Sequence, residues 1–217
     1  KPEYYLPFAG TYTLTGKLSG LQDLRGNPSI DSAYSYFEKY YSKKNMSKQI
    51  KPLKLNLESI FDLKKMRCSS AYKKTNIDEY KSYINSNLKN KLLTYEKDTI
   101  PQFEELYELS KKAFKIFLEK KVANNINLQT DIFVKANSKS IKLGKDNKLS
   151  VINSDQIESN SDKFVIFNTD TRLLKKLLIG PKYAHWVNAE IGSHINFFRK
   201  PNVYERHLYL SMSHFHC

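Results

Sequence analysis

The sequence predicts an α+β fold in which helices come first and a compact unit of strands and helices follows. Three observations indicate this class. Apolar residues recur at helical spacing between Asn76 and Leu118. After Ala123 the helical spacing gives way to short runs rich in β-branched and aromatic residues. Within Phe164–Phe198 the pattern changes from strand to helix and back to strand, so the last third should hold both.

Size and composition allow one large domain or two small ones in 217 residues. A hydrophobic content of 40%, with 13% aromatic residues, is enough for a packed core. No run of about 18 apolar residues occurs, so we expect no membrane span. Cys68 and Cys217 are too few for a disulfide framework, which favours free thiols and a cytoplasmic location.

The net charge of +14 comes mostly from lysine, with five arginines among 36 basic residues. Proteins that read nucleic acids rely on the forked contacts of arginine. The basic residues are also spread over the whole chain instead of forming a dense basic tail. We therefore expect a solvated lysine-rich surface and keep a nucleic-acid or anionic-membrane partner as a minor alternative.

The first quarter of the chain is expected to hold a strand, a helix and a second strand. The aromatic run at Tyr4 predicts a short buried strand that ends at Pro7. Asn27 and Pro28 are typical of a helix start, with Asn at the N-cap and Pro in the first turn. Alternating leucines within Gln49–Leu63 predict a half-buried strand. These leucines are Leu53, Leu55 and Leu57.

Two longer helices follow. One should begin at Asn76, where Glu79 completes a capping box, and run to Leu92. The next should begin after Thr99, with Gln102 at the corresponding position. The short segment between them predicts that the two helices pack as a hairpin.

The last third should alternate strands and helices. We expect a helix at Thr171–Ile179, capped by Thr169 or Asp170 and stopped by Gly180. The longest strand is expected at Asn188–Arg199, and a last helix after Pro201. Further strands are predicted at Asp131–Ala136, Ser140–Leu143, Lys148–Asn153 and Lys163–Phe167.

Three residues near the C-terminus are candidates for ligand binding: Trp186, Glu190 and His194. Glu190 and His194 lie four apart and would share one face of the predicted strand. They could line a pocket or act as an acid–base couple, or they could form a structural hydrogen-bonded pair. Trp186 follows a helix stop and could gate a cavity, or it could close the end of the core.

No catalytic or metal-ligating residue can be assigned. The first histidine is His185, whereas a zinc hydrolase site needs two or three histidines and a carboxylate. His214, His216 and Cys217 could hold a metal through alternate residues, or could belong to a frayed terminus. Phosphate loops, dinucleotide fingerprints and nucleophile elbows do not occur. We expect no cofactor bound by this chain itself.

Four segments together resemble the C-terminal half of certain bacterial metallo-β-lactamase-fold hydrolases, relatives of the metallo-hydrolase part of CMP-N-acetylneuraminate hydroxylase. The segments are Tyr4–Gly10, Lys51–Leu63, Ile77–Ile84 and Ala184–Ile195. The resemblance implies that residues 1–60 finish an αββα fold, that 61–123 form a helical connector, and that 124–217 form a sterol-carrier-like α+β module.

The resemblance also implies where the metal would lie. The family's His-x-His-x-Asp-His motif is absent here, so zinc or another divalent metal is expected in a region before Lys1. Some relatives place a metal-binding histidine just after a proline in a strand like Tyr4–Gly10. Pro7 is followed by Phe8 and Ala9, so that ligand is not supplied.

The expected function is therefore that of a non-catalytic accessory segment that completes the hydrolase fold and shapes a substrate cleft. Its expected partners are its own N-terminal region and a small-molecule or lipid-like substrate. One alternative is a binding module, beginning near Asn125, that encloses an apolar, lipid-like ligand. The other alternative is lysine-mediated nucleic-acid binding.

Overall fold

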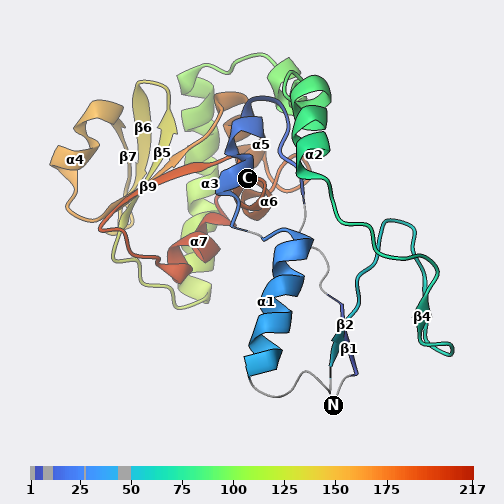
Figure 1. Ribbon diagram of the computed structural model, residues 1–217. Coiled ribbons are helices and arrows are strands. Elements are labelled where there is room, and N and C mark those ends of the chain that lie inside the picture. Colours follow the sequence, from blue (N-terminus) through green and yellow to red (C-terminus); the bar gives the residue numbers. More distant parts are fainter. Residues whose placement is uncertain (1–2, 7–11, 27, 44–49) are drawn as a thin grey trace. The chain divides into compact units, whose positions relative to one another are not determined.

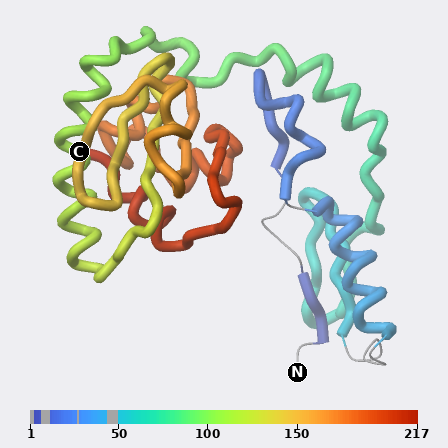
Figure 2. The backbone as a smooth tube through the Cα atoms, turned by 90° about the vertical axis from the view of Figure 1, so that its left-hand side faces the viewer, coloured from blue at the N-terminus to red at the C-terminus, as the bar shows by residue number. Residues whose placement is uncertain are grey.

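A computed structural model describes residues 3–6, 12–26, 28–43 and 50–217, and its architecture is mixed α+β (Figures 1 and 2). The chain divides into two compact units, Lys1–Leu92 (unit 1) and Leu93–Cys217 (unit 2). This division differs from the predicted boundaries at 60 and 123 because helix α3 (Phe103–Ala123) packs against the sheet that follows it. The two helices predicted to form a hairpin consequently fall in different units.

Unit 2 is built on a five-stranded sheet with the order β7-β6-β5-β8-β9. Strands β5, β6 and β7 form an antiparallel meander, β8 pairs with β5 in parallel, and β9 pairs with β8 antiparallel. The four strands predicted between residues 131 and 167 are confirmed. The strand bounds are β5 (Asp131–Ala136), β6 (Lys139–Leu143), β7 (Leu149–Asn153), β8 (Phe164–Asn168) and β9 (Asn196–Lys200).

One face of this sheet is covered by helices, and the main core lies between the two layers. Phe117 of α3, Phe167 of β8 and Leu174 of α5 are among its buried side chains. On the other face, Ile157 packs against Phe133 and Phe164. The remaining helical segments of unit 2 are η3 (Thr94–Lys97), η4 (Ser154–Gln156), α4 (Ile157–Asn160), α5 (Thr171–Ile179), α6 (Trp186–Ile191) and α7 (Arg206–Met212).

Local signals at the ends of α5 act as predicted. The Asp170 side chain caps the helix by accepting a hydrogen bond from the Arg172 backbone N–H at 3.0 Å. Gly180 ends it with φ +126°, a left-handed conformation that side chains rarely adopt. A Cβ atom at Gly180 would also lie 3.1 Å from the Cys217 carbonyl oxygen.

The prediction of a long strand at Asn188–Arg199 is wrong. Residues Trp186–Ile191 form helix α6, and β9 begins at Asn196. Trp186 and Ala189, three residues apart, both bury their side chains, which helical geometry allows on one face. The His185 side chain also caps this helix, since its Nδ1 accepts a hydrogen bond from the Val187 N–H at 3.2 Å.

Unit 1 contains short elements. Strands β1 (Tyr4–Tyr5) and β2 (Lys51–Pro52) pair in parallel, and β3 (Phe61–Asp62) and β4 (Arg67–Cys68) pair antiparallel. Three longer helical segments accompany them. These are η1 (Gly16–Leu24), α1 (Ile30–Lys43) and α2 (Ile77–Tyr83), and the last continues as the π-helical turn η2 (Ile84–Leu88).

The N-cap predicted at Asn76, at the start of α2, is confirmed, but the reciprocal capping-box bond from Glu79 to the Asn76 backbone N–H is not formed. Asn76 Oδ1 accepts hydrogen bonds from the backbone N–H groups of Asp78 and Glu79, at 3.0 and 3.3 Å. The Asn76 amide in turn donates to the Glu79 carboxylate at 3.0 Å. The sequence pattern therefore located this helix start correctly.

The strand predicted from alternating leucines is largely wrong. Pairing with β1 involves Lys51 and Pro52, and Leu57 is 94% exposed. At α1, the Ser29 hydroxyl accepts a hydrogen bond from the Ser32 N–H at 3.1 Å. The predicted cap at Asn27 and the predicted strand end at Pro7 lie outside the described residues.

Asp131, at the start of β5, joins three segments of unit 2. Its carboxylate lies 3.0 Å from Lys142 Nζ and accepts hydrogen bonds from the Lys145 N–H at 2.9 Å and the Ser161 hydroxyl at 2.8 Å. Burial by itself raises the pKa of Asp131, but the three hydrogen bonds and the Lys142 charge outweigh it. The net effect is a pKa below the ordinary value.

We predict that Asp131→Asn lowers the free energy of unfolding of unit 2 by about 1–3 kcal/mol at pH 7. Because the folded-state pKa of Asp131 is depressed, its contribution is present above pH of about 4 and is lost as pH falls through the folded value. The variant should therefore lose less stability than the parent between pH 7 and pH 3.

Urea unfolding followed by fluorescence of Trp186, the single tryptophan, measures both effects. Asp162→Asn, at an exposed position, is the matched control and should change the free energy of unfolding by less than about 0.5 kcal/mol. Equal acid sensitivity in Asp131→Asn and the parent would contradict the assignment.

Candidate functional site

The first candidate, Trp186, belongs to the core of unit 2. Its side chain is 3% exposed and its indole Nε1 donates a hydrogen bond to the Phe215 carbonyl oxygen at 2.8 Å. The indole meets the Phe167 ring edge-on, with 6.0 Å between centroids. Trp186 could gate a cavity or close the end of the core, and this geometry favours the second role.

His194 lies in the turn between α6 and β9. Its Nδ1 is hydrogen bonded to the hydroxyl of Tyr95, at 3.2 Å, and its carbonyl oxygen accepts a hydrogen bond from Thr169 Oγ1 at 2.8 Å. These bonds connect the turn to η3 and to the end of β8. The arrangement is that of a structural histidine with a ring nitrogen already bonded.

Glu190 is half-buried on α6, and burial raises its pKa, while the charge of Arg199 lowers it in part. The carboxylate also acts electrostatically on the phenol of Tyr209. Because α6 ends at Ile191, Glu190 and His194 do not lie on one strand face as predicted. Glu190 faces instead toward Arg199 and Tyr209.

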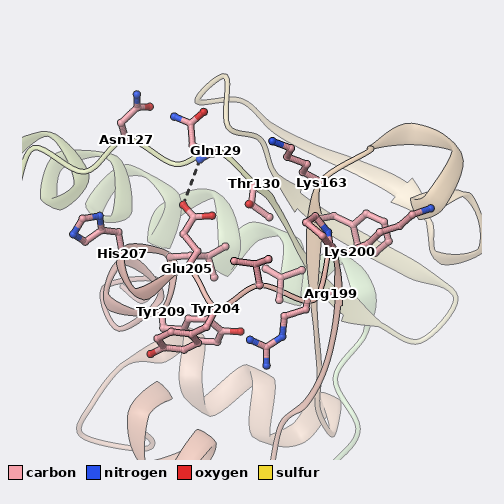
Figure 3. A pocket seen from close by; sticks show the side chains of 15 residues that line it. Asn127, Gln129, Thr130, Lys163, Arg199, Lys200, Tyr204, Glu205, His207 and Tyr209 are labelled. Carbon is pink, nitrogen blue, oxygen red and sulfur yellow. Dashed lines mark hydrogen bonds between the residues drawn. The ribbon is translucent and has the colours of Figure 1, made fainter.

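Arg199 and Tyr209 line a cavity of about 450 Å³ beside the start of β8 and the end of β9, where the chain turns toward α7 (Figure 3). The connection from α3 to β5 forms another wall through Asn127 and Gln129. In Figure 3, the Arg199 guanidinium lies beside the stacked rings of Tyr204 and Tyr209. The pocket therefore combines a cationic group with aromatic surface.

The register of the sheet explains how Arg199 reaches this place. Arg199 pairs with Val165 on β8, and Phe197 pairs with Phe167, so Arg199 belongs to the face that the helices cover. Its guanidinium carbon lies 5.8 Å from the centroid of the Tyr209 ring, which indicates a cation–π contact. The Tyr204 ring stacks on Tyr209 with 4.8 Å between centroids.

Two polar groups of this pocket form no salt bridge or hydrogen bond with the residues that the structure describes, although the charge of Arg199 acts on the nearby Glu190 carboxylate. Arg199 is half-buried and forms no salt bridge within that part of the chain. The Tyr209 hydroxyl is buried and finds no hydrogen-bond partner there. Burial raises the pKa of the Tyr209 phenol, although Arg199 opposes the rise. The phenol is therefore a neutral hydrogen-bond donor at physiological pH.

The C-terminal His–Cys cluster does not form a metal site. His216 Nδ1 lies 3.0 Å from the Cys217 carbonyl oxygen, and Cys217 Sγ lies 3.6 Å from the Leu109 carbonyl oxygen. The pKa of His214 is lowered, first by burial and then by the charge of Lys120. Within residues 3–6, 12–26, 28–43 and 50–217, no three His, Cys, Asp or Glu side chains are placed to hold a metal ion.

Arg199 and Tyr209 were not among the residues singled out from the sequence. One signal could have found Arg199. It continues the alternating series of Ile195 and Phe197, so a cation stands on a face that is otherwise apolar. Nothing in the sequence indicated the orphan hydroxyl of Tyr209, because that depends on tertiary packing.

Comparisons of the chain with protein-family models, with curated proteins and with solved structures find no match. The helices of the described residues include none long and apolar enough to cross a bilayer.

We predict that Trp186→Phe lowers the free energy of unfolding by about 1–3 kcal/mol. The change leaves the Phe215 carbonyl oxygen without its donor and removes part of a buried ring. Far-UV circular dichroism in urea measures the loss without needing the tryptophan. Val187→Ala, at a neighbouring position that is 38% exposed, should cost less than about 1 kcal/mol. A parent-like stability for Trp186→Phe would contradict a core role.

Proposed function

We propose that this chain is a non-catalytic accessory segment of a metal-dependent hydrolase of the metallo-β-lactamase kind. In this proposal, unit 1 completes a fold together with a metal-binding region that precedes Lys1, and unit 2 is a self-sufficient module attached to it. One observation carries the proposal: the described residues of unit 1 bury very little apolar surface.

Among the described residues of unit 1, the buried apolar side chains are those of Leu14, Tyr34 and Ile84. All the other buried apolar side chains of the described residues lie in unit 2. A segment of this length needs a much larger core to offset the conformational entropy lost on folding. The apolar burial among the described residues of unit 1 is therefore too small to stabilise a fold, and we propose that a partner surface supplies the rest.

The surface of unit 1 supports the same inference. Leu57, Ile60 and Leu63, which lead into and through β3, are 94%, 70% and 77% exposed. Large apolar side chains that follow one another in this way mark surfaces that pack against another chain or segment. We propose that they are covered by the metal-binding part of the hydrolase fold.

The proposal assigns no catalysis to this chain. The polar groups that the sequence offered as an acid–base couple, Glu190 and His194, lie on a helix and in a turn with separate partners. Any metal would come from the region before Lys1, where the family motif is expected. The role of this chain is to support and shape the cleft.

The relation of unit 2 to sterol-carrier modules also remains a proposal, supported by its mixed five-stranded sheet with helices on one face. The alternative of an enclosed lipid-like ligand has less support. Side chains such as Phe117, Phe167 and Leu174 fill the space between sheet and helices and are at most 2% exposed. An acyl chain would enter only if these layers separated.

We expect fragment 93–217 to unfold in one cooperative transition and fragment 1–92 to show none, because the core belongs to unit 2. Thermal unfolding by circular dichroism and the dispersion of amide proton shifts distinguish the two outcomes. The whole chain, 1–217, should carry no stoichiometric zinc in elemental analysis. Cooperative unfolding of fragment 1–92, or one bound zinc ion per chain, would contradict the proposal.

A second prediction concerns the exposed leucines of unit 1. The double variant Leu57→Ser/Leu63→Ser should keep the thermal midpoint of the whole chain and should raise its solubility, because both side chains are largely exposed. Leu174→Ser, at a fully buried position of unit 2, is the contrasting variant and should cost more than about 3 kcal/mol. A large loss of stability in the double variant would show that the leucines serve an internal core.

A further inference from the structure

Residues 213–217 (the C-terminal segment) pack on the core of unit 2. The Phe215 side chain is fully buried within that core. Its carbonyl oxygen accepts the hydrogen bond from the Trp186 indole N–H at 2.8 Å. The Cys217 N–H donates to the carbonyl oxygen of Leu178, in the last turn of α5, also at 2.8 Å. These contacts attach the C-terminal segment to α5 and to α6.

Three half-buried histidines lie at this attachment: His185 at the start of α6, and His214 and His216 within the segment. The His216 ring packs over Gly180, since its Nδ1 lies 3.4 Å from the place that a Cβ atom would take there. This Nδ1 also lies 3.0 Å from the Cys217 oxygen, which can only accept, so it donates in both charge states. Histidine is the side chain whose charge ordinarily changes between pH of about 5 and 8, so the cluster can respond to mild acid.

The hydrogen bond at His185 requires a neutral imidazole. A backbone N–H can only donate, so the His185 Nδ1 that accepts from the Val187 N–H must carry a lone pair. Protonation of Nδ1 removes this acceptor and leaves the first turn of α6 without its cap. Trp186, the residue that follows the cap, holds the C-terminal segment through its indole. The loss of the cap therefore acts on the residue that binds the segment.

The groups that act on His214 are cations or become cations in acid. They are Lys120 of α3, His216 and His185. Burial, followed by the charge of Lys120, lowers the pKa of His214. The neutral ring is therefore favoured while the C-terminal segment is in place, and the charged ring is favoured once the segment is released into water.

The carboxylates of the neighbouring helices do not offset this charge. Glu190 of α6 interacts with Arg199, and Glu108 of α3 forms an ion pair on its own helix. Glu119 of α3 is exposed and is not among the groups that act on His214. Helices α5 and α7 contain no acidic residue. Protonation of the histidines therefore adds positive charge that none of these helices neutralises.

We propose that mild acid detaches the C-terminal segment: protonation of His185 and His214 weakens its attachment, and the end of the core at Trp186 and Phe215 opens to water. The neutral histidines of the closed state sense the pH, and the segment is the part that moves. The proposal goes beyond the accessory role described above and does not depend on it, because every residue involved lies in unit 2.

The direction of the pH dependence follows from proton uptake. The open state binds protons at His185 and His214 that the closed state disfavours, so opening becomes more frequent as pH falls below about 6.5. Asp131 acts in more acidic solution, because its pKa lies below the ordinary value of a carboxyl group. Opening between pH of about 7.5 and about 5 should consequently be local, and β5 should stay protected.

The test uses the whole chain and follows hydrogen exchange of the Trp186 indole N–H and the Cys217 amide by NMR. Trp186 is the single tryptophan, so its indole gives one signal. Protection factors, in which the pH dependence of the intrinsic exchange rate is divided out, should fall at least about tenfold from pH of about 7.5 to about 5. The protection factors of β5 amides should change less than about threefold.

The double variant His185→Asn/His214→Gln removes both titrating groups. Asparagine is a good N-cap residue that mild acid does not charge, so α6 keeps a cap. At pH of about 5 the variant should retain, within about twofold, the protection that it shows at pH of about 7.5. His207→Gln, at an exposed position of α7, is the matched control and should lose protection in acid as the parent does.

Three results would overturn the proposal. The first is constant protection of the Trp186 indole and the Cys217 amide in the parent between the two pH values. The second is an equal fall in the parent and the double variant, because another group would then be the sensor. The third is an equal fall at β5, which would indicate global unfolding. The single variant His185→Asn should show a smaller fall than the parent, and it keeps the test decisive if the double variant does not fold.

Discussion

The parallel pairing of β5 with β8 is the constraint on which the rest of unit 2 depends. Parallel neighbours cannot be joined by a tight turn, so the chain must form β6, β7 and α4 before it returns as β8. Both strands are also central, and their side chains are buried on both faces of the sheet. The helix layer covers one face, and Ile157 covers part of the other. Asp131 stabilises the start of β5, where the meander and the loop before β8 come together.

The pocket follows from the way this sheet ends. β9 is an edge strand, and its side chains alternate between the two faces, so Arg199 must share the helix-covered face with Phe197. Near the end of the strand the cover consists of α7 and the segment before it, which bring Tyr209 onto the guanidinium and stack Tyr204 on Tyr209. Unit 1 differs from unit 2 in the length of its elements and in the burial of its apolar side chains. Its elements are short, and apolar side chains such as Leu57 remain exposed.

The sequence was informative where local chemistry decides structure. The N-cap at Asn76, the cap at Asp170 and the left-handed Gly180 act within a few residues, and all were predicted. The alternation of apolar and polar residues was a less reliable signal, because such a segment forms a strand only where a neighbouring strand can pair with it. Leu57 belongs to no sheet of the described residues, and residues 186–191 bury Trp186 and Ala189 equally well as a helix. The pocket could not be predicted, because Arg199 and Tyr209 meet only through the packing of α7 on β9.

The central claim is that the stability of this chain resides in unit 2. Native-state hydrogen exchange of the whole chain, read by mass spectrometry, tests it most directly. The amides of β5 and β8 should exchange slowest, through global unfolding, while those of β1 to β4 and of α2 should exchange orders of magnitude faster through local opening. If amides of unit 1 were protected as strongly as those of β5, unit 1 would have a core of its own, and the account would be contradicted.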